Sequence, residues 1–495
     1  MCRRTLTRSY ARTPDSHSAS PNVRRIYLLT FVQKLSESLW QMQLLSLYLF
    51  AVFGDMRMVG WAEGTQGAIR ILAAFSIGKA VDTLPRRPLL YFASCFGLGF
   101  HVVCFVVVIC PQLVPVSRFA AWLCLLALFA FYQCLLQTLA DVMFADSVVS
   151  GARIVSYTRR GAVDKAAQIC GPLLQIVFFS MNVAPRGAGG ESSANTSAPR
   201  AASSTDSWDI GWSERTLVPL IATGVAIGGA SSLLLLSLDQ RSTLGHASDA
   251  LHVEAPQRDV EIAPEPAPSA EGDKHHQGEA AAAAGPSASG AVALPPEPSA
   301  PEEPAPTAAT GARLRWSILI FDLARVCSGG LVVKFVGLFF VDAYGATPLG
   351  IATMLACVFA TSLLAVYATG RVMHRWECLR RGPVCFGLLV VVDTCNFLTA
   401  FAPSLPAAAV SWALREGALH SMLELKKSLM MDYTPKSSRG VWNAVQGLQQ
   451  GVWSGTATVG GYIVHSLGFR ADFLMMSWGF FMCTSVWALG VRWTR

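Results

Sequence analysis

The chain has 495 residues, of which 52% are hydrophobic and only 14% charged, and its formal net charge is +7. Soluble globular proteins carry about 25% charged residues, so this composition argues against a soluble enzyme and favours a membrane protein. The positive charge does not predict a nucleic-acid-binding surface, because the arginines fall mainly in short loops between apolar blocks, which is how membrane orientation is encoded.

The first 25 residues are rich in Arg and Ser and contain one acid, Asp15. This composition fits either an organelle transit peptide or a disordered, positively charged cytoplasmic tail, and we favour the tail. Thirteen cysteines are present, yet no Cys-x-x-Cys pair occurs and most cysteines lie inside apolar blocks. They are therefore expected to be small buried hydrophobes rather than parts of a disulfide framework or a zinc site.

Twelve apolar blocks of membrane-spanning length follow along the chain. Between the sixth and the seventh, residues 239–312 consist mainly of Pro, Ala, Ser and Glu, which predicts a disordered linker. The sequence therefore predicts an all-α integral membrane protein with twelve transmembrane helices in two six-helix bundles, residues 26–238 and 313–495, preceded by the tail of residues 1–25. The blocks lie at about 26–54, 58–81, 88–110, 118–145, 156–182, 215–238, 314–342, 346–370, 383–402, 405–431, 440–465 and 471–492.

Alternate short loops carry most of the basic residues, while the loops between them are nearly free of such runs. The positive-inside rule places the basic loops, both termini and the linker in the cytoplasm. The loop at about 183–214 then lies on the other side, where Asn195 of an Asn-Thr-Ser triplet would be available for glycosylation. The basic loop residues are Arg86, Arg87, Arg153, Arg159, Arg160, Arg371, Arg375, Arg380, Arg381, Lys436 and Arg439.

The two halves resemble each other at the loop that follows the fourth block of each half. Asp146 and Arg153 are seven residues apart in the first half, as are Asp432 and Arg439 in the second. Equivalent positions of this kind indicate duplication, and duplicated halves are the usual construction of secondary transporters.

The stretch IGKAVDTLPRRPLL connects the second and third blocks and carries Gly78, Asp82, Arg86 and Arg87. It resembles the signature that major facilitator superfamily transporters have between their second and third helices: Gly, three residues, Asp, two residues, Gly, Arg, then Arg or Lys. Pro85 stands where the family has its second glycine. The resemblance covers both halves and implies two pseudo-symmetric six-helix bundles and transport by alternating access.

The resemblance also implies that this cluster latches the two halves together on the cytoplasmic side in the outward-facing state. Asp82 lies at a predicted helix end, where it can hold an arginine or a helix N-terminus. The alternative is that Arg86 and Arg87 only orient the helices, a role that would not need Asp82. The expected latch residues are Gly78, Asp82, Arg86, Arg87, Asp146, Arg153, Asp432 and Arg439.

Charged and polar side chains within the apolar blocks are the candidates for solute binding or ion coupling, because charge inside a membrane is costly. The family resemblance implies that the first, fourth, seventh and tenth helices line a central cavity, and the richest charged stripes fall on those blocks. The alternative is that pairs such as Lys34 with Glu37, or Asp322 with Arg325, are internal salt bridges. The candidates are Lys34, Glu37, Gln41, Arg70, Gln133, Gln137, Asp141, Asp322, Arg325, Lys334, Arg415, Glu416 and His420.

We therefore expect a secondary transporter or facilitator that moves a small polar solute across the bilayer by alternating access. The basic candidates lean towards an anionic solute. His420 lies in one stripe with Glu416 and Glu424, so it is a candidate carrier of a coupling proton, the alternative being a packing role. The rival hypothesis is a non-transporting relative that acts as a sensor or regulatory protein, for which an apolar, collapsed cavity would be expected.

The sequence contains no Gly-x-x-x-x-Gly-Lys loop, no Ser/His/Asp set and no metal-ligand set. Neither ATP-driven transport nor an intramembrane enzyme nor a cofactor is therefore expected. We expect a monomer without a nucleic-acid partner, located in the plasma membrane or an endomembrane, with an organelle envelope as the alternative.

Overall fold

The computed structural model describes residues 20–113, 115–148, 153–182, 214–239, 308–376, 380–432 and 439–490, and all regular secondary structure in these ranges is helical. Most of the expected tail, Asn195 and residues 240–307 of the expected linker lie outside the described residues. The predicted all-α class is confirmed.

The helices of the first half are α1 (Pro21–Trp40), α2 (Leu44–Phe53), α3 (Met56–Thr83), α4 (Arg86–Ile109), α5 (Arg118–Ser147), α6 (Arg153–Asn182) and α7 (Glu214–Leu234), with short 3₁₀ turns at Pro111–Leu113 and Leu235–Ser237. Those of the second half are α8 (Ala308–Val332), α9 (Val336–Tyr344), α10 (Pro348–Arg375), α11 (Arg381–Phe401), α12 (Leu405–Asp432), α13 (Arg439–Leu467) and α14 (Phe469–Gly490). Six helices are long and apolar enough to cross a membrane, or seven if the bent pair α8–α9 is one span. Twelve membrane segments result when α1–α2 and α8–α9 each count as one.

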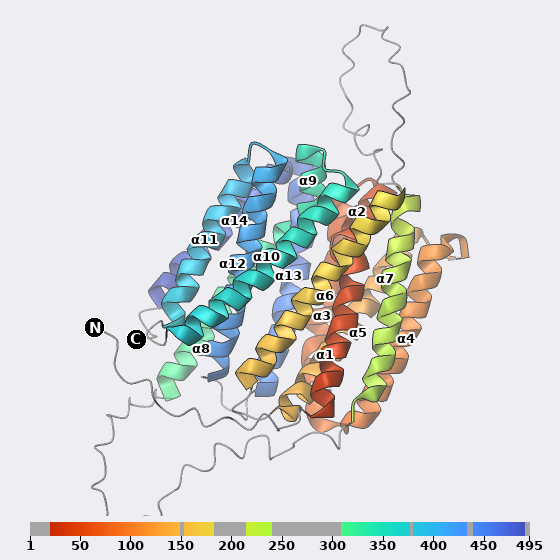
Figure 1. The fold of residues 1–495 in the computed structure, drawn as a ribbon. Coiled ribbons are helices and arrows are strands. Elements are labelled where there is room, and N and C mark those ends of the chain that lie inside the picture. Colours follow the sequence, from red (N-terminus) through yellow and green to blue (C-terminus); the bar gives the residue numbers. More distant parts are fainter. Residues whose placement is uncertain are drawn as a thin grey trace, which may run out of the picture.

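The two halves repeat the same set of helix contacts. In the first half, α1 packs on α6 and α7, α3 packs on α5, and α4 packs on α5 and α7. In the second half, α8 packs on α13 and α14, α10 packs on α12, and α11 packs on α12 and α14. Each pair of the first half thus has its counterpart in the second. Figure 1 shows the helices of the first half, red to yellow-green, grouped beside those of the second half, green to violet-blue.

The first membrane segment of each half is broken nearer its C-terminal end, which the sequence analysis did not predict. The expected helix of residues 26–54 divides at residues 41–43, and that of residues 314–342 divides at residues 333–335, where α8 and α9 form an angle of 41°. One side chain joins the two breaks: Gln43 Nε2 donates to the carbonyl oxygen of Val333 (3.1 Å), and Gln43 Oε1 accepts from the amide of Gly337 (3.3 Å). A break in a membrane helix is tolerated when another group satisfies the freed backbone atoms, and Gln43 does so from the opposite half.

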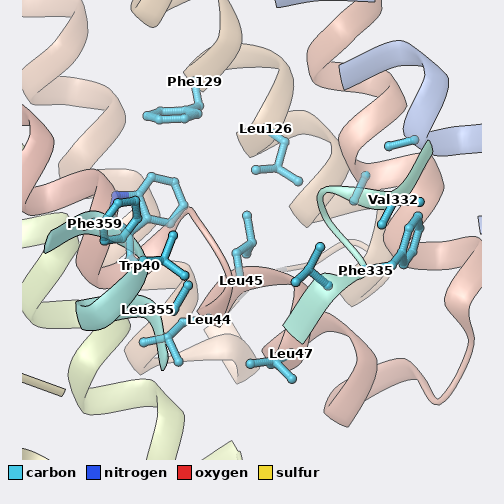
Figure 2. Packing of buried hydrophobic residues seen from close by; sticks show 14 of the residues in the cluster. Trp40, Leu44, Leu45, Leu47, Leu126, Phe129, Val332, Phe335, Leu355 and Phe359 are labelled. Atoms are coloured by element: carbon cyan, nitrogen blue, oxygen red, sulfur yellow. The ribbon is translucent and has the colours of Figure 1, made fainter. Parts of the chain in front are cut away.

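Apolar side chains fill the space around these breaks. Figure 2 shows Trp40 and Leu44 of the first half with Leu355 and Phe359 of the second, all members of one buried cluster. Trp40 is 1% exposed and packs edge to face on Phe129, with ring centroids 4.8 Å apart. The end of the bundle that contains α2 and α9, here called the α2–α9 end, is therefore held together by apolar packing as well as by Gln43.

The two halves meet mainly along α3 with α13 and along α6 with α10, two pairs that the internal symmetry exchanges. The α3–α13 contact is built on glycines. A Cβ atom on Gly67 would lie 2.3 Å from the backbone nitrogen of Gly455 and 2.5 Å from the carbonyl oxygen of Gly451. The two backbones touch here, as in other membrane helix pairs with small interface residues.

We predict that Gly67→Leu strongly lowers the thermal stability of the detergent-purified protein, because the added side chain has to push α3 away from α13; overpacking typically costs about 1–3 kcal/mol. Gly99→Leu on α4 is the matched control, since nothing lies within 4 Å of a Cβ atom at that position. Melting temperatures measured by intrinsic fluorescence test this prediction. Equal melting temperatures for the two variants would contradict the close glycine contact.

Candidate functional site

A buried ion pair joins the two halves at the break between α8 and α9. Lys334, in the break between α8 and α9, lies 3.1 Å from the carboxylate of Glu63 on α3, and the two side chains are 6% and 1% exposed. The ammonium group also lies 5.9 Å from the centre of the Trp453 ring. Because the pair is almost dry, separating the halves at this level would leave two buried charges without partners unless water or a solute replaced them.

Two weaker polar contacts cross the same interface nearer the surface of the α2–α9 end. Trp61 Nε1 donates to the hydroxyl group of Tyr462 (3.2 Å), and His465 Nδ1 lies 3.8 Å from Asp55. Asp55 also caps α3 by accepting from the amide of Arg57 (2.8 Å), and hydrogen bonds from Arg57 hold the pKa of Asp55 below its usual value. These contacts close the α2–α9 end in this structure.

Two neighbouring glutamines on α13 contact charged groups of opposite halves. Gln450 Oε1 accepts from Arg70 Nη1 of α3 (2.6 Å), and Gln449 Nε2 donates to Asp322 Oδ2 of α8 (3.2 Å). Movement of α13 relative to α3 would therefore disturb the surroundings of Arg70 directly.

The predicted pair on the first helix forms within one half. Lys34 Nζ lies 2.8 Å from Glu37 Oε2, and Gln33 Nε2 donates to Glu37 Oε1 (3.0 Å). Gln33 in turn accepts from Ser231 of α7 (2.5 Å). The salt-bridge alternative for Lys34 and Glu37 thus describes this conformation, although the Lys34 side chain remains 25% exposed.

A further cross-half contact lies near the middle of α6 and α12. Lys165 Nζ is 3.3 Å from His420 Nε2, and the same His420 nitrogen is 3.5 Å from Glu416 Oε2. Asp164 lies 3.8 Å from the Lys165 ammonium group. His420 and Asp164 are 27% and 23% exposed at their side chains, so this cluster is only partly closed off from the surface.

The charges of the second half form two further buried groups. Asp322, which is 1% exposed, pairs with Lys426 of α12 and lies 3.5 Å from Arg325 Nε. Arg415 pairs with Glu416, and its Nε donates to Asn396 Oδ1 of α11 (3.1 Å). Both arrangements hold the helices of this half together.

The remaining candidates lie in the first half. Asp141 pairs with Arg160 of α6 at 2.5 Å, which leaves this acid in an α5–α6 contact. Gln41 Nε2 is 3.5 Å from Gln66 Oε1, and Gln137 Nε2 is 3.5 Å from Gln133 Oε1. These amide contacts are at the outer limit of hydrogen bonding and so are weak.

The expected latch residues are only partly joined. Arg86, at the start of α4, pairs with Asp146, near the end of α5, whereas Asp82 and Arg87 are exposed. Among the residues that the structure describes, Asp82 has no ion-pair partner, and the side chains of Arg153, Asp432 and Arg439 lie outside the description. Gly78 is partly buried on α3. The latch role of Asp82 therefore stays a prediction.

Six members of these clusters are not among the site candidates that the sequence predicts: Glu63, Asp164, Lys165, Lys426, Gln449 and Gln450. The signal for Asp164 and Lys165 was present, since both are charged and lie inside the fifth apolar block. The family resemblance does not point to them, because it implies a cavity lined by the first, fourth, seventh and tenth helices. The structure brings side chains of α3, α6 and α13 to the same interface.

Comparison with solved structures identifies the architecture. The chain matches a bacterial homologue of the iron transporter ferroportin in an inward-facing state, with a TM-score of 0.59 at 11% identity over 95% of this chain and 98% of that one. It also matches the xylose transporter XylE from E. coli in a partially occluded inward-open conformation (TM-score 0.59, 10% identity, 94% and 96% of the two chains). The chain has the major facilitator superfamily fold.

The human organic anion transporter MFSD10 is a further structural neighbour, with a TM-score of 0.57 at 15% identity over 94% of this chain and all (100%) of that one. At the level of sequence, no family model and no curated protein matches the chain. The major facilitator fold and the apolar helices together make this a multi-pass membrane protein, and they confirm the fold that the Gly78–Arg87 motif implied.

Proposed function

We propose that the chain is a secondary transporter that moves a small polar solute by alternating access. The observation that carries this proposal is the set of charged side chains between the two halves, joined by Lys334–Glu63, Arg70–Gln450 and Lys165–His420. Burying a charged side chain inside a membrane protein costs free energy. Charges between the two halves are therefore expected to act on a solute or an ion. A structural protein would be served as well by apolar packing.

The contacts between the halves are of two kinds, close glycine contacts and exchangeable polar contacts. This combination is compatible with a rocking motion of one half against the other. Backbone contact between the glycines of α3 and α13 is close and leaves no side chains interlocked there, so it can serve as the axis of movement. The polar contacts at the α2–α9 end, from Gln43 and from the Lys334–Glu63 pair, are few and can be exchanged for water or solute. The positive-inside rule assigns this end to the outside, because the opposite end carries Arg86 and Arg87.

The Lys165–His420 contact supports coupling to protons. A neutral His420 can accept a hydrogen bond from the Lys165 ammonium group, whereas a protonated one places two cations 3.3 Å apart. The other charged groups that face His420 are Glu416 on its own helix, which favours the protonated form, and Arg415 and Arg325, which oppose it. Protonation would therefore weaken one cross-half contact while strengthening a contact within α12.

We predict that proteoliposomes containing the purified protein take up at least one polar solute from a broad metabolite panel down its gradient. Lys165→Met should reduce that uptake at least tenfold, because it removes a charged cross-half contact worth about 1.5–3 kcal/mol. Lys79→Met is the matched control, since Lys79 is exposed on α3 near Arg86. Uptake of no solute by the wild-type protein would favour the non-transporting sensor instead.

We predict in addition that uptake changes on acidification below about pH 6, on the acid side of the range where histidines titrate, because Lys165, Arg415 and Arg325 oppose protonation of His420. Acidification should disrupt the Lys165–His420 contact and alter the rate, whereas His420→Gln, whose amide oxygen can accept from Lys165 at any pH, should flatten the profile. Initial rates measured across this range at constant ionic strength provide the test. A His420→Gln profile with the wild-type shape would show that the proton, if one is coupled, binds elsewhere.

A further inference from the structure

Arg70 differs from the other buried cations of the bundle. Lys34, Arg160, Lys334, Arg415 and Lys426 each have a carboxylate within ion-pair distance. Arg70 is 8% exposed, yet its hydrogen-bond partner is the neutral Gln450, and its Nε atom is buried with no hydrogen-bond partner among the described residues. A buried guanidinium without a carboxylate at ion-pair distance is unfavourable, which sets Arg70 apart from these paired cations.

The nearest acids do not supply the missing partner. Glu37 and Glu63 lie within electrostatic range of Arg70 but each is engaged elsewhere. Glu37 is held by Lys34 at 2.8 Å, and Glu63 is paired with Lys334 at 3.1 Å, although neither Glu63 oxygen accepts a hydrogen bond from the described residues. Each of these pairs is neutral as a whole, so neither strongly repels an anion that approaches Arg70.

Two further buried donors lie on α3 itself and on α5, which packs against it. Gln66, 0% exposed, precedes Arg70 by four residues and so lies on the same face of α3. Gln133 on α5 is 1% exposed, and its neighbour Cys134 is within electrostatic range of Arg70. The Nε2 atoms of both glutamines are buried without a hydrogen-bond partner among the described residues. One group that only accepts hydrogen bonds would suit these three unused donors on the two packed helices.

A carboxylate meets that requirement best. It has two coplanar acceptor oxygens and no donor, and it matches the planar fork of a guanidinium. Since Nη1 of Arg70 is taken by Gln450, the Nε side of the fork remains for the ligand. Gln41 and Gln137 contact Gln66 and Gln133 and are themselves partly exposed, so they mark the side from which a solute would enter.

We propose that Arg70, Gln66 and Gln133 form a subsite for a carboxylate group of the transported solute, an inference that rests on the proposed transport function. A bound carboxylate would complete the coordination of Arg70 next to its contact with Gln450 on α13. Binding would thereby act on the α3–α13 interface, which links occupation of the subsite to the relative position of the halves.

The test is the melting temperature of the purified full-length protein with acetate, succinate or benzoate, each compared with acetamide, succinamide or benzamide at equal ionic strength. At least one carboxylate should raise the melting temperature more than its amide does. Arg70→Gln should abolish the difference, Arg70→Lys should retain a reduced one, and Gln66→Leu should weaken the apparent affinity on the order of tenfold. Lys79→Gln, at an exposed position on α3, is the control that should behave as wild type.

Equal shifts from acid and amide, no shift from any of the three carboxylates, or an undiminished shift in Arg70→Gln would overturn the subsite. A shift with inorganic phosphate alone would overturn its assignment to carboxylates. Uptake assays on the same preparations separate this inference from the function itself. If Arg70→Gln transports carboxylate-bearing solutes at the wild-type rate, the subsite is wrong and the transporter stands; if wild type transports nothing, the proposed function fails.

Discussion

The cost of placing charge inside a membrane is the constraint on which the rest of this structure depends. The two bundles bury acids and bases at their interface, and most of these are paired, either within a half, as Lys34 with Glu37, or across the halves, as Lys334 with Glu63. Removing one partner of such a buried pair typically costs about 3–5 kcal/mol. Relative positions of the two halves that leave a buried charge without a partner are therefore high in free energy. This favours a small number of discrete conformational states over a continuous range.

The backbone breaks follow from the same constraint. Gln43 satisfies the carbonyl group of Val333 and the amide of Gly337 from the opposite half, so the break in one bundle is completed by the other. The α13 helix combines the two kinds of contact, because it touches α3 through glycines and holds Arg70 through Gln450. Binding of a ligand to Arg70 would thus act directly on α13, the helix through which the second half contacts α3.

Much of the fold could be predicted from the sequence, because membrane-spanning length and the Gly78–Arg87 motif are local properties of the chain. The breaks at residues 41–43 and 333–335 could not, since neither contains a proline, and the second is completed by Gln43 from the other half. For the site, charge inside an apolar block found Lys34, Glu37 and Arg70, and spacing offered the Lys34–Glu37 pair, but the partner of Arg70 could not be predicted. Asp322, for example, pairs with Lys426, 104 residues away, more closely than with Arg325 on the next turn. Partner choice is decided by packing between helices, which spacing along one helix does not reveal.

The central claim is that the halves move against each other, so that the α2–α9 end opens. The most direct measurement places spin labels at Gln112 and Ser404, exposed positions at that end on opposite halves, in a cysteine-free background, and records their distance distribution in lipid nanodiscs. We expect two populations, a short distance that matches this structure and a longer one, whose proportions change when Glu63 and Lys334 are both replaced by Gln. A single short distance in both the wild type and the double variant would contradict it.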